Sequence, residues 1–460
     1  MKGVSMAKRL LTSIVSLGFL SSVLLASPAQ ADAANLKGAG SSYANKFITT
    51  CAVNDPATAV TYNPGGSGSG RTAFANGTVD FGASDAASSI TSWSGSRAGY
   101  TSSSFSYIPI VGGPIAVLYQ IPGITTGQLR LDSLTIAKIY SGKITKWNDP
   151  AIVADMKANA IWANSTKKSA YKGASALWTP TSATAATVNI TLTPAALKAA
   201  KGKKIEILED KKSVKTATVA AKGQIAITLT TKAAAYTVKL DGKEVAKFAQ
   251  STPTLPAKAI TVVYRSDGSG TTNNFIKPLN ALSTTWTVND NFTTAIPGGT
   301  AAIAALGAAF QGQSGSANVS NAIADTNGSI GYTEISFVTD ATRAAKGMLA
   351  ANIKNVAGKF VAPTAAATSS MIADSDIDAK GFVTFNYKQT TNTTAYPFVA
   401  ITYALARTAP SSKATIVADY LKWILTTYAP AAAESLGYAP LTGAILTVAK
   451  NNAARIGSGN

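Results

Sequence analysis

The sequence predicts an α/β protein into which a smaller, β-rich domain is inserted. Residues 34 to about 160 alternate short apolar strands with helical patterns, and the same alternation resumes after residue 255, which is typical of an α/β sheet. Between them, strand patterns dominate residues 165–250, which indicates a small Ig-like β-sandwich. With 460 residues, 46% hydrophobic and 14% charged, the chain is long enough for two or three globular domains.

The N-terminus, residues 1–31, has the pattern of a secretory signal peptide. Lys2, Lys8 and Arg9 precede an apolar stretch from Leu10 to Leu25, and Ala29-Gln30-Ala31 fits a cleavage site. We therefore expect an exported protein, periplasmic or extracellular and associated with the cell surface. No second long apolar segment follows, so the mature chain is expected to be soluble, with a retained N-terminal anchor as the alternative.

The elements of the α/β part follow from local patterns. Apolar runs predict strands at residues 60–62, 79–81, 108–111 and 260–264. Helical patterns cover residues 133–140, with Asp132 or Ser133 as the cap, then about 272–282, 414–426 and 428–436.

The inserted segment differs from the rest in both pattern and charge. Apolar and polar residues alternate at 188–192, 225–229 and 236–240, and Asp241-Gly242 then predicts a hairpin turn into residues 245–248. Residues 161–250 contain 15 lysines and 5 acidic residues, so this fifth of the chain carries more than half of the net charge of +19. These lysines indicate either a solvated face or a surface for an anionic partner.

The residue types that are missing exclude several kinds of chemistry. There is no histidine, so Ser-His-Asp and Cys-His nucleophiles and histidine metal sites are excluded. Cys51 is the only cysteine. It cannot form an internal disulfide, and we expect it to be a small apolar residue at the end of a helix. We therefore expect no catalytic residues, no metal and no cofactor.

The segment Arg265-Ser266-Asp267-Gly268-Ser269-Gly270-Thr271-Thr272 is a candidate anion site. It follows an apolar strand and precedes a helix, whose first backbone N–H groups lack partners and whose dipole favours negative charge. Ser269 and Thr271 add hydroxyl donors, and Arg265 adds a planar guanidinium fork.

Three further loops share this character. They are Gly38 to Tyr43, Gly65 to Arg71 and Asp80 to Ala86. The second approaches a P-loop, but Arg71 stands where that motif needs lysine. Each loop alone is only a weak signal, because a Gly/Ser turn before a helix is usually a connection.

Together these loops resemble the solute-binding subunit of the high-affinity ABC-type phosphate importer. The resemblance includes Gly142 to Pro150, Gly328 to Tyr332 and Leu436 to Leu441, and covers roughly residues 35–160 and 255–445 in family order. It implies a type II-like, two-lobed periplasmic-binding fold that closes on phosphate. Residues 34–112 and 336–460 would form lobe 1, residues 113–335 would form lobe 2, and residues 165–250 would be the insert within lobe 2.

The resemblance also assigns roles to individual residues. The phosphate ligands would be Ser42, the Tyr43 N–H, Ser67, Asp85, Arg265, Ser269, Gly270 and Thr271, with Asp267 holding the Arg265 side chain. Asp85 then has a physical purpose, because phosphate carries a proton that it can donate to a carboxylate. Sulfate has no such proton, so Asp85 would leave two like charges unbridged and reject it.

The sequence departs from the family pattern at two points. Tyr43 stands where the family usually has Phe, which is tolerable if the N–H is the ligand. The insertion of roughly 85 residues after Asn148-Asp149-Pro150 is unusual, although compact folds tolerate surface insertions.

We expect a monomer whose partners are inorganic phosphate and the membrane permease of an ABC importer, and no nucleic acid. Two alternatives stay open. One is a surface protein whose basic domain binds an anionic cell-wall polymer or polyphosphate, and the other is a phosphatase-like enzyme that uses the same loops.

Overall fold

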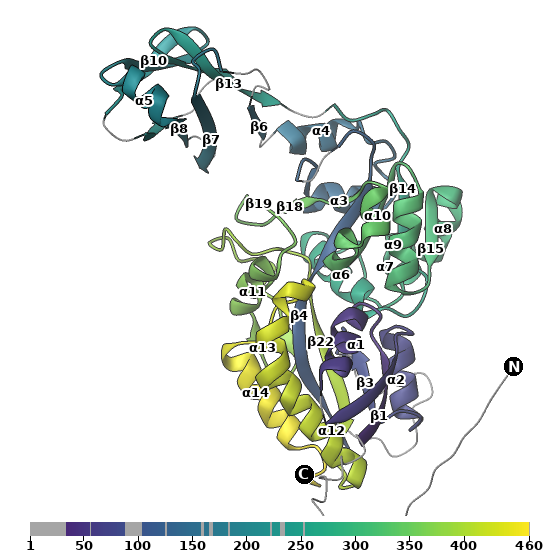
Figure 1. Ribbon diagram of the computed structural model, residues 1–460. Helices are drawn as coiled ribbons and strands as arrows, with labels where there is room; N and C mark the ends of the chain where they lie inside the picture. The colour runs from purple at the N-terminus through teal and green to yellow at the C-terminus, as the bar shows by residue number, and fades with distance from the viewer. Residues whose placement is uncertain are drawn as a thin grey trace, which may run out of the picture.

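Two α/β lobes are stacked one above the other in this computed structural model, and a β-domain projects from the upper lobe (Figure 1). The expected signal peptide lies outside the residues that the structure describes. These residues are 34–55, 57–87, 104–124, 127–157, 161–164, 169–182, 185–220, 223–230, 235–251 and 254–459.

Lobe 1 contains a five-stranded sheet in the order β2-β1-β3-β22-β4. Its strands are β1 (Ala34–Gly40), β2 (Thr58–Asn63), β3 (Phe81–Ser84), β22 (Val399–Arg407) and the first part of β4 (Phe105–Gln120). β1 runs parallel to β2 and β3, whereas β22 is antiparallel to both of its neighbours. The α/β expectation is therefore confirmed for this lobe.

Lobe 2 repeats this arrangement with the order β15-β14-β16-β4-β17. The added strands are β14 (Thr261–Arg265), β15 (Phe310–Gln313), β16 (Ser329–Glu334) and β17 (Met348–Ala350). Here β14 is parallel to β15 and β16, and the second part of β4 is antiparallel to β16 and β17. The two lobes thus have the same topology and share one long strand.

The chain crosses between the lobes at two places. In β4, Pro114 still pairs with β22 of lobe 1, and Ile115 already pairs with Glu334 of lobe 2. The expected return at residue 336 is too early, because β17 still belongs to the lobe 2 sheet. The chain returns after β18 (Asn352–Lys354) and β19 (Phe360–Val361), at α11 (Ala365–Ala373). The pairing of β17 with the free edge of β4 keeps the chain in lobe 2 beyond residue 336, and residues 336–347 contain no local sequence signal for the point of return.

Helices cover both faces of each sheet. In lobe 1, Phe81 contacts Tyr420 of α12 (Ser412–Trp423), with 5.9 Å between the ring centroids, whereas neighbouring Gly82 faces Phe74 of α2 (Ser67–Ala75). Successive residues of a strand point to opposite faces, so α12 and α2 lie on opposite sides of the sheet. In lobe 2, Tyr332 stacks on α6 (Gly270–Leu282), and Gly331 faces α9 (Gly315–Asp325).

The remaining helices mostly follow the local patterns. α3 spans Ser133–Tyr140 as expected, and Asp132 Oδ1 accepts from the Leu134 N–H at 2.9 Å. Residues 424–428 wind as a π-helix, so the expected helix over 414–426 ends as α12 at Trp423. The others are α1 (Asn45–Asn54), α4 (Pro150–Lys157), α7 (Phe292–Ala295), α8 (Gly299–Leu306), α10 (Ala341–Ala345), α13 (Ala429–Ala432) and α14 (Gly443–Ala454). Among the described residues, none of the helices has the length and apolarity that a membrane crossing requires.

The insert consists of two antiparallel sheets around a hydrophobic cluster of its own. One sheet has the order β11-β8-β7 and the other β10-β9-β12-β13-β6. The elements are β6 (Ile161–Asn164), β7 (Ala174–Ser182), β8 (Ala185–Leu192), α5 (Pro194–Ala200), β9 (Lys204–Glu209), β10 (Lys212–Thr218), β11 (Gln224–Thr230), β12 (Ala235–Leu240) and β13 (Lys243–Ser251). Trp178 packs between Tyr236 and Phe248 at the centre.

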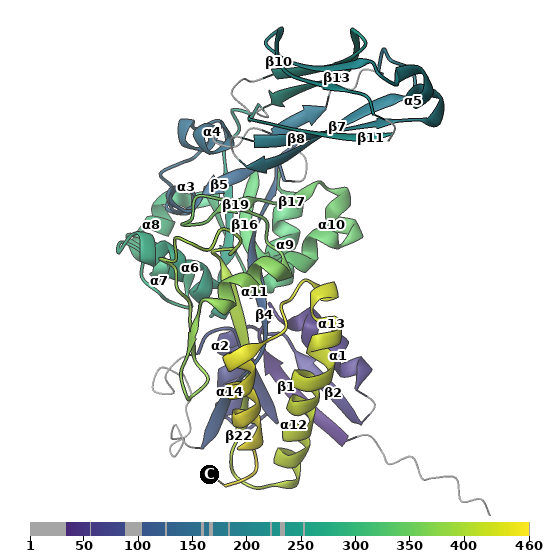
Figure 2. The same cartoon turned by 90° about the vertical axis from the view of Figure 1, so that its left-hand side faces the viewer.

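The two ends of the insert leave lobe 2 side by side. Lys146 and Ala259 form a bridge, and the Trp147 N–H donates to the Lys258 carbonyl at 3.0 Å. The insert therefore interrupts lobe 2 at one surface point and leaves its sheet intact (Figure 2). Asp241 and Gly242 both have positive φ between β12 and β13, which confirms the expected hairpin turn.

Candidate functional site

The loops singled out in the sequence meet where the two lobes face each other. Lobe 1 contributes the end of β1, the start of α2 and the end of β3, and lobe 2 contributes the end of β14 and the start of α6. Every residue expected to bind the anion is buried: Ser42, Tyr43, Ser67, Asp85, Arg265, Ser269, Gly270 and Thr271. Ser42 and Thr271, which are 229 positions apart in the sequence, thus belong to one polar cluster.

Asp85 is the centre of this cluster, with 2% of its surface exposed. Its Oδ1 accepts short hydrogen bonds from the hydroxyls of Ser41 (2.6 Å) and Thr402 (2.9 Å). Its Oδ2 accepts longer bonds from Ser67 (3.4 Å) and, across the lobes, from Thr271 (3.3 Å). One carboxylate oxygen is therefore held firmly by lobe 1, and the other faces two of the expected anion ligands.

The pKa of Asp85 reflects two opposing effects. Burial raises the pKa above the ordinary carboxyl value, and the hydrogen bonds from Ser41 and Thr402 and the charge of Arg265 offset part of that rise. Hydroxyl donors favour the ionised form, because a carboxylate accepts these bonds and a neutral acid does so less well. The four hydroxyls thus support an ionised Asp85 in a place where burial opposes it.

Arg265 provides the positive charge, and only 2% of its surface is exposed. Asp267 binds it in a fork, in which Nε donates to Oδ1 at 2.7 Å and Nη2 donates to Oδ2. The Gly315 N–H holds the same Asp267 Oδ1 at 3.0 Å. Asp267 does not bind Arg265 Nη1, which instead donates to Ser316 Oγ at 3.4 Å. Asp267 has the supporting position that the resemblance assigned to it.

The start of α6 approaches lobe 1 very closely. Ser269 caps the helix by accepting from the Thr272 N–H at 3.1 Å, and the helix begins at Gly270, two residues earlier than expected. A Cβ on Gly270 would lie 2.6 Å from Ser67 Oγ and 2.9 Å from Asp85 Cβ. Only glycine permits this approach, which brings backbone N–H groups of α6 next to Asp85.

Sequence reasoning missed several members of the cluster. Thr402 lies within the apolar run of β22, where an isolated polar residue was the available signal. Ser316 donates its N–H to Ser42 Oγ at 3.1 Å and has no motif of its own. Glu334 ends β16 and is buried, and this burial raises its pKa to about 8. Ser41 lies in the Gly38–Tyr43 loop that the sequence singles out, but the family resemblance assigns no ligand to it.

The lobes also touch beside the cluster. The Gly68 N–H donates to the Gly268 carbonyl at 3.0 Å. Arg71 of α2 forms an ion pair with Asp290 of lobe 2 and donates to Ser84 Oγ at 2.8 Å. Arg71 therefore joins the two lobes, and its partners are protein groups.

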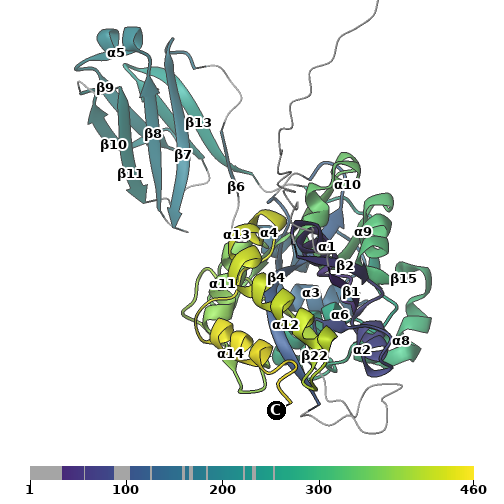
Figure 3. The same cartoon turned by 60° about the horizontal axis from the view of Figure 1, so that its bottom comes forward.

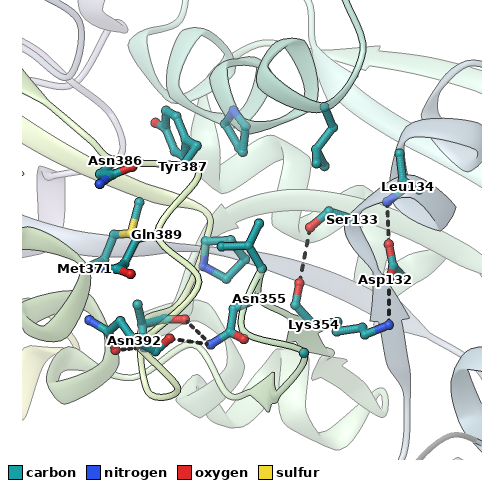
Figure 4. Close-up of a pocket in the computed structure, with 16 residues that line it drawn as sticks. Asp132, Ser133, Leu134, Lys354, Asn355, Met371, Asn386, Tyr387, Gln389 and Asn392 are labelled. Atoms are coloured by element: carbon teal, nitrogen blue, oxygen red, sulfur yellow. Dashed lines mark hydrogen bonds and ion pairs between the residues drawn. The ribbon is translucent and has the colours of Figure 1, made fainter. Parts of the chain in front are cut away.

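Another cavity, of about 320 Å³, lies elsewhere between the lobes (Figure 4). It is lined by the start of α3, the end of α6, the β18–β19 turn and the loop over residues 386–397. Its Lys354 and Asp132 form an ion pair, and Asn355 donates to backbone carbonyls at 3.1 and 3.3 Å. None of the expected anion ligands lines it. Within the described ranges, no three acidic or cysteine side chains are grouped as a metal site would require.

Comparison with known proteins places this architecture in a family. A protein family described as the PBP superfamily domain matches residues 26–247 and, in a second match, residues 188–427. The chain belongs to the PBP superfamily. The two-lobed fold expected from the sequence is therefore confirmed.

Phosphate-binding proteins are among the curated relatives of this PBP protein. Phosphate-binding protein PstS2 of Mycobacterium bovis (strain BCG / Pasteur 1173P2) is 40% identical over 109 residues, which are 24% of this chain and 28% of that protein. The first relatives are thus matched over little more than a quarter of their length. Phosphate-binding protein PstS of Pasteurella multocida (strain Pm70) is 26% identical over 389 residues, or 83% of this chain and 78% of that protein.

Solved structures show the same fold. A high-affinity periplasmic phosphate-binding protein with bound phosphate has a TM-score of 0.55 at 18% identity, and covers 91% of this chain and 93% of its own. A human phosphate-binding apolipoprotein has a TM-score of 0.53 at 17% identity, with 91% and 92% covered. At these identities the likeness concerns the fold.

Proposed function

We propose that this PBP protein binds inorganic phosphate between its lobes and delivers it to an ABC-type membrane importer. The observation that carries the proposal is the buried cluster in which Asp85, four hydroxyls and Arg265 lie together. The names of the relatives and the phosphate-bound structural neighbour support it. The proposed ligands are Ser42, the Tyr43 N–H, Ser67, Asp85, Arg265, Ser269, Gly270 and Thr271.

The cluster suits a dehydrated anion that still carries a proton. A buried anion needs many donors, because an unsatisfied charge in a protein interior is very costly. Hydroxyls, the α6 N-terminus and Arg265 provide these donors. Asp85 Oδ2, held by its two longer bonds, accepts the phosphate proton, whereas sulfate offers none and meets a like charge.

Several features of transport belong to the same proposal. The mature chain after residue 31 works outside the cytoplasm as a monomer, and a membrane permease receives the phosphate. In this proposal the protein releases its phosphate chemically unchanged. A phosphatase-like activity is the competing function, and turnover of a generic phosphomonoester would favour it.

Equilibrium titration with phosphate and sulfate tests the proposal. Wild-type protein is expected to bind phosphate saturably and sulfate far more weakly. Asp85→Asn is expected to lose this discrimination, because the amide donates to sulfate and no longer repels it. Asp325→Asn, an exposed carboxylate paired with Lys346, is the matched control and is expected to behave like wild type. Equal binding of both anions by wild-type protein would contradict the proposal.

A further inference from the structure

The charge of the insert is distributed unevenly over its surfaces. The outer face of the β11-β8-β7 sheet carries uncharged side chains, among them Leu177, Asn189 and Thr228. On the outer face of the other sheet, acids offset most of the lysine charge. Lys204 pairs with Glu206 at 3.0 Å, and Lys247 pairs with Glu244 at 3.1 Å. Lys211, Lys212, Lys215 and Lys239 also form no ion pair among the described residues. Glu209 and Asp210, at the β9–β10 turn, offset part of their charge.

The excess gathers at the end of the sandwich that α5 covers. This lysine tip consists of five exposed residues: Lys172, Lys198, Lys201, Lys203 and Lys243. Lys198 lies on α5 and Lys201 is its C-cap, while Gly173 approaches Thr193 at the start of the same helix. The Lys243 ammonium lies 5.9 Å from the centre of the Tyr171 ring, and Lys203 lies near the β12–β13 turn.

Acidic residues neutralise little of this tip. Asp241 lies 3.3 Å from Lys203 Nζ. Within the described part of the chain, the other four lysines form no ion pair. Four ammonium groups are therefore available at one end of a small domain.

The tip lies at the end of the insert that is remote from the lobes (Figure 3). β13 runs from Lys243 at the tip to Ser251 beside the connection to lobe 2, and its nine residues span about 30 Å at about 3.3 Å each. At physiological ionic strength exposed charges are screened over about 8 Å. The lysines are thus too remote to attract phosphate to the interlobe site, and their charge is presented outward.

We propose that the lysine tip binds an extended polyanion with repeated phosphate charges, either polyphosphate or a phosphodiester polymer of the cell envelope. Lysine binds phosphate as a flexible point charge, which suits a chain of repeated anions better than a single oriented ligand. The tip contains no arginine fork. This function is additional to phosphate capture between the lobes and does not depend on it.

The composition of the tip argues against other anionic partners. Single-stranded nucleic acids need aromatic platforms on which bases stack. At the tip, the Lys243 ammonium lies over the ring of Tyr171, so the face of that ring is already occupied. Membrane surfaces favour exposed apolar residues beside the basic ones. Among the residues of the insert whose exposure the structure describes, the large exposed apolar ones are Leu177 and Val214, which lie within β7 and β10 and outside the tip. Charge without stacking or insertion fits a flexible phosphate polymer.

The test compares two triple variants of the full chain that change its net charge equally. One is Lys198→Glu/Lys201→Glu/Lys243→Glu at the tip. The control is Lys211→Glu/Lys212→Glu/Lys215→Glu, on the β9–β10 turn and the adjoining part of β10, away from the tip. Binding of labelled polyphosphate and of poly(glycerol phosphate) is measured by fluorescence anisotropy over a series of salt concentrations.

We expect the tip variant to lose at least about tenfold in polymer affinity, and its log–log salt slope to fall by about 2, as for three contacts to a flexible strand. The control is expected to stay close to wild type. Equal losses in both variants would show that binding follows net charge and would overturn the proposal. So would wild-type protein that binds neither polymer, or that prefers single-stranded DNA or anionic vesicles.

Two further readouts complete the design. Whichever polymer binds more tightly identifies the source of the phosphate charges. Titration of the interlobe site with inorganic phosphate is expected to give the same affinity in both variants, so failure of phosphate binding and failure of polymer binding are separate results. Slower phosphate capture by the tip variant alone would assign the lysines to electrostatic steering and overturn the proposal.

Discussion

Replacing Thr402 by Val removes one of the two short bonds that hold Asp85. Thr402 is fully buried on β22, and its hydroxyl donates to Asp85 Oδ1 at 2.9 Å. Valine has nearly the same shape but no hydroxyl, so the change removes a donor without leaving a large cavity. Only Ser41 then remains on Oδ1.

The size of the effect follows from the charge on Asp85. A hydrogen bond to a charged group contributes about 1.5–3 kcal/mol, and about 1.4 kcal/mol corresponds to one pKa unit or a tenfold change in affinity. The pKa of Asp85, which burial already raises, is therefore expected to rise further when a donor that favours the ionised form is removed. Phosphate affinity near neutral pH is expected to fall by roughly tenfold to a hundredfold.

The change in selectivity depends on pH in a defined direction. Ionised Asp85 accepts the phosphate proton and repels sulfate, whereas protonated Asp85 donates to sulfate. Discrimination is thus present above the pKa of Asp85 and is lost as the pH falls through it. Because Thr402→Val raises this pKa, the loss is expected to begin at a higher pH than in wild type.

Isothermal titrations with phosphate and sulfate from about pH 5 to about pH 8 measure both effects. Thr402→Ser keeps the hydroxyl and is expected to stay close to wild type. Thr368→Val, a buried threonine of lobe 1 that bonds only the Thr364 carbonyl, controls for general destabilisation. If Thr402→Val keeps the wild-type phosphate-to-sulfate ratio and pH profile, the hydroxyls do not orient Asp85 and the reasoning fails.

Three further predictions concern neighbouring groups. Burial raises the pKa of Glu334 from 4.5 to about 8, so the contribution of this neutral carboxyl to stability is complete below about pH 4.5 and is lost as the pH rises toward 8. In chemical denaturation, wild type is therefore expected to lose about 4 kcal/mol of unfolding free energy over this range relative to Glu334→Gln. Parallel stability profiles of the two proteins would contradict this prediction. Arg71→Leu removes the ion pair with Asp290 between the lobes and is expected to speed phosphate release about tenfold in stopped-flow measurements. In an Asp290→Asn background, the same substitution is expected to have little further effect. Additive effects of the two substitutions would refute the coupling between Arg71 and Asp290. Gly270→Ala places a Cβ 2.6 Å from Ser67 Oγ and is expected to reduce phosphate affinity at least tenfold, with little change in the thermal stability of the unliganded protein. Unchanged phosphate affinity would contradict the close approach of α6 to lobe 1.

Local patterns were informative wherever one element determines its own structure. The helix over residues 133–140 with its Asp132 cap and the Asp241-Gly242 hairpin were predicted correctly, because caps and tight turns depend on neighbouring residues. The strands of the insert were predicted equally well, because alternating apolar and polar residues indicate a strand with one buried face. The return of the chain from lobe 2 was placed too early, because the pairing of β17 with β4 is a contact between segments more than 200 residues apart.

The same distinction applies to the candidate site. The candidate anion-binding loops were visible in the sequence, since glycines, hydroxyls and a helix start are local features, and so was the separate, lysine-rich β-domain. Only the tertiary structure decided that Thr402 and Ser41 hold one oxygen of Asp85, that Ser316 and Glu334 border the cluster, and that the lysines gather at a tip remote from the lobes. The physical reason is that hydrogen bonds, desolvation and charge density depend on distances in space. Residues such as Asp85 and Thr402, which lie 317 positions apart, become neighbours only when the sheet is assembled.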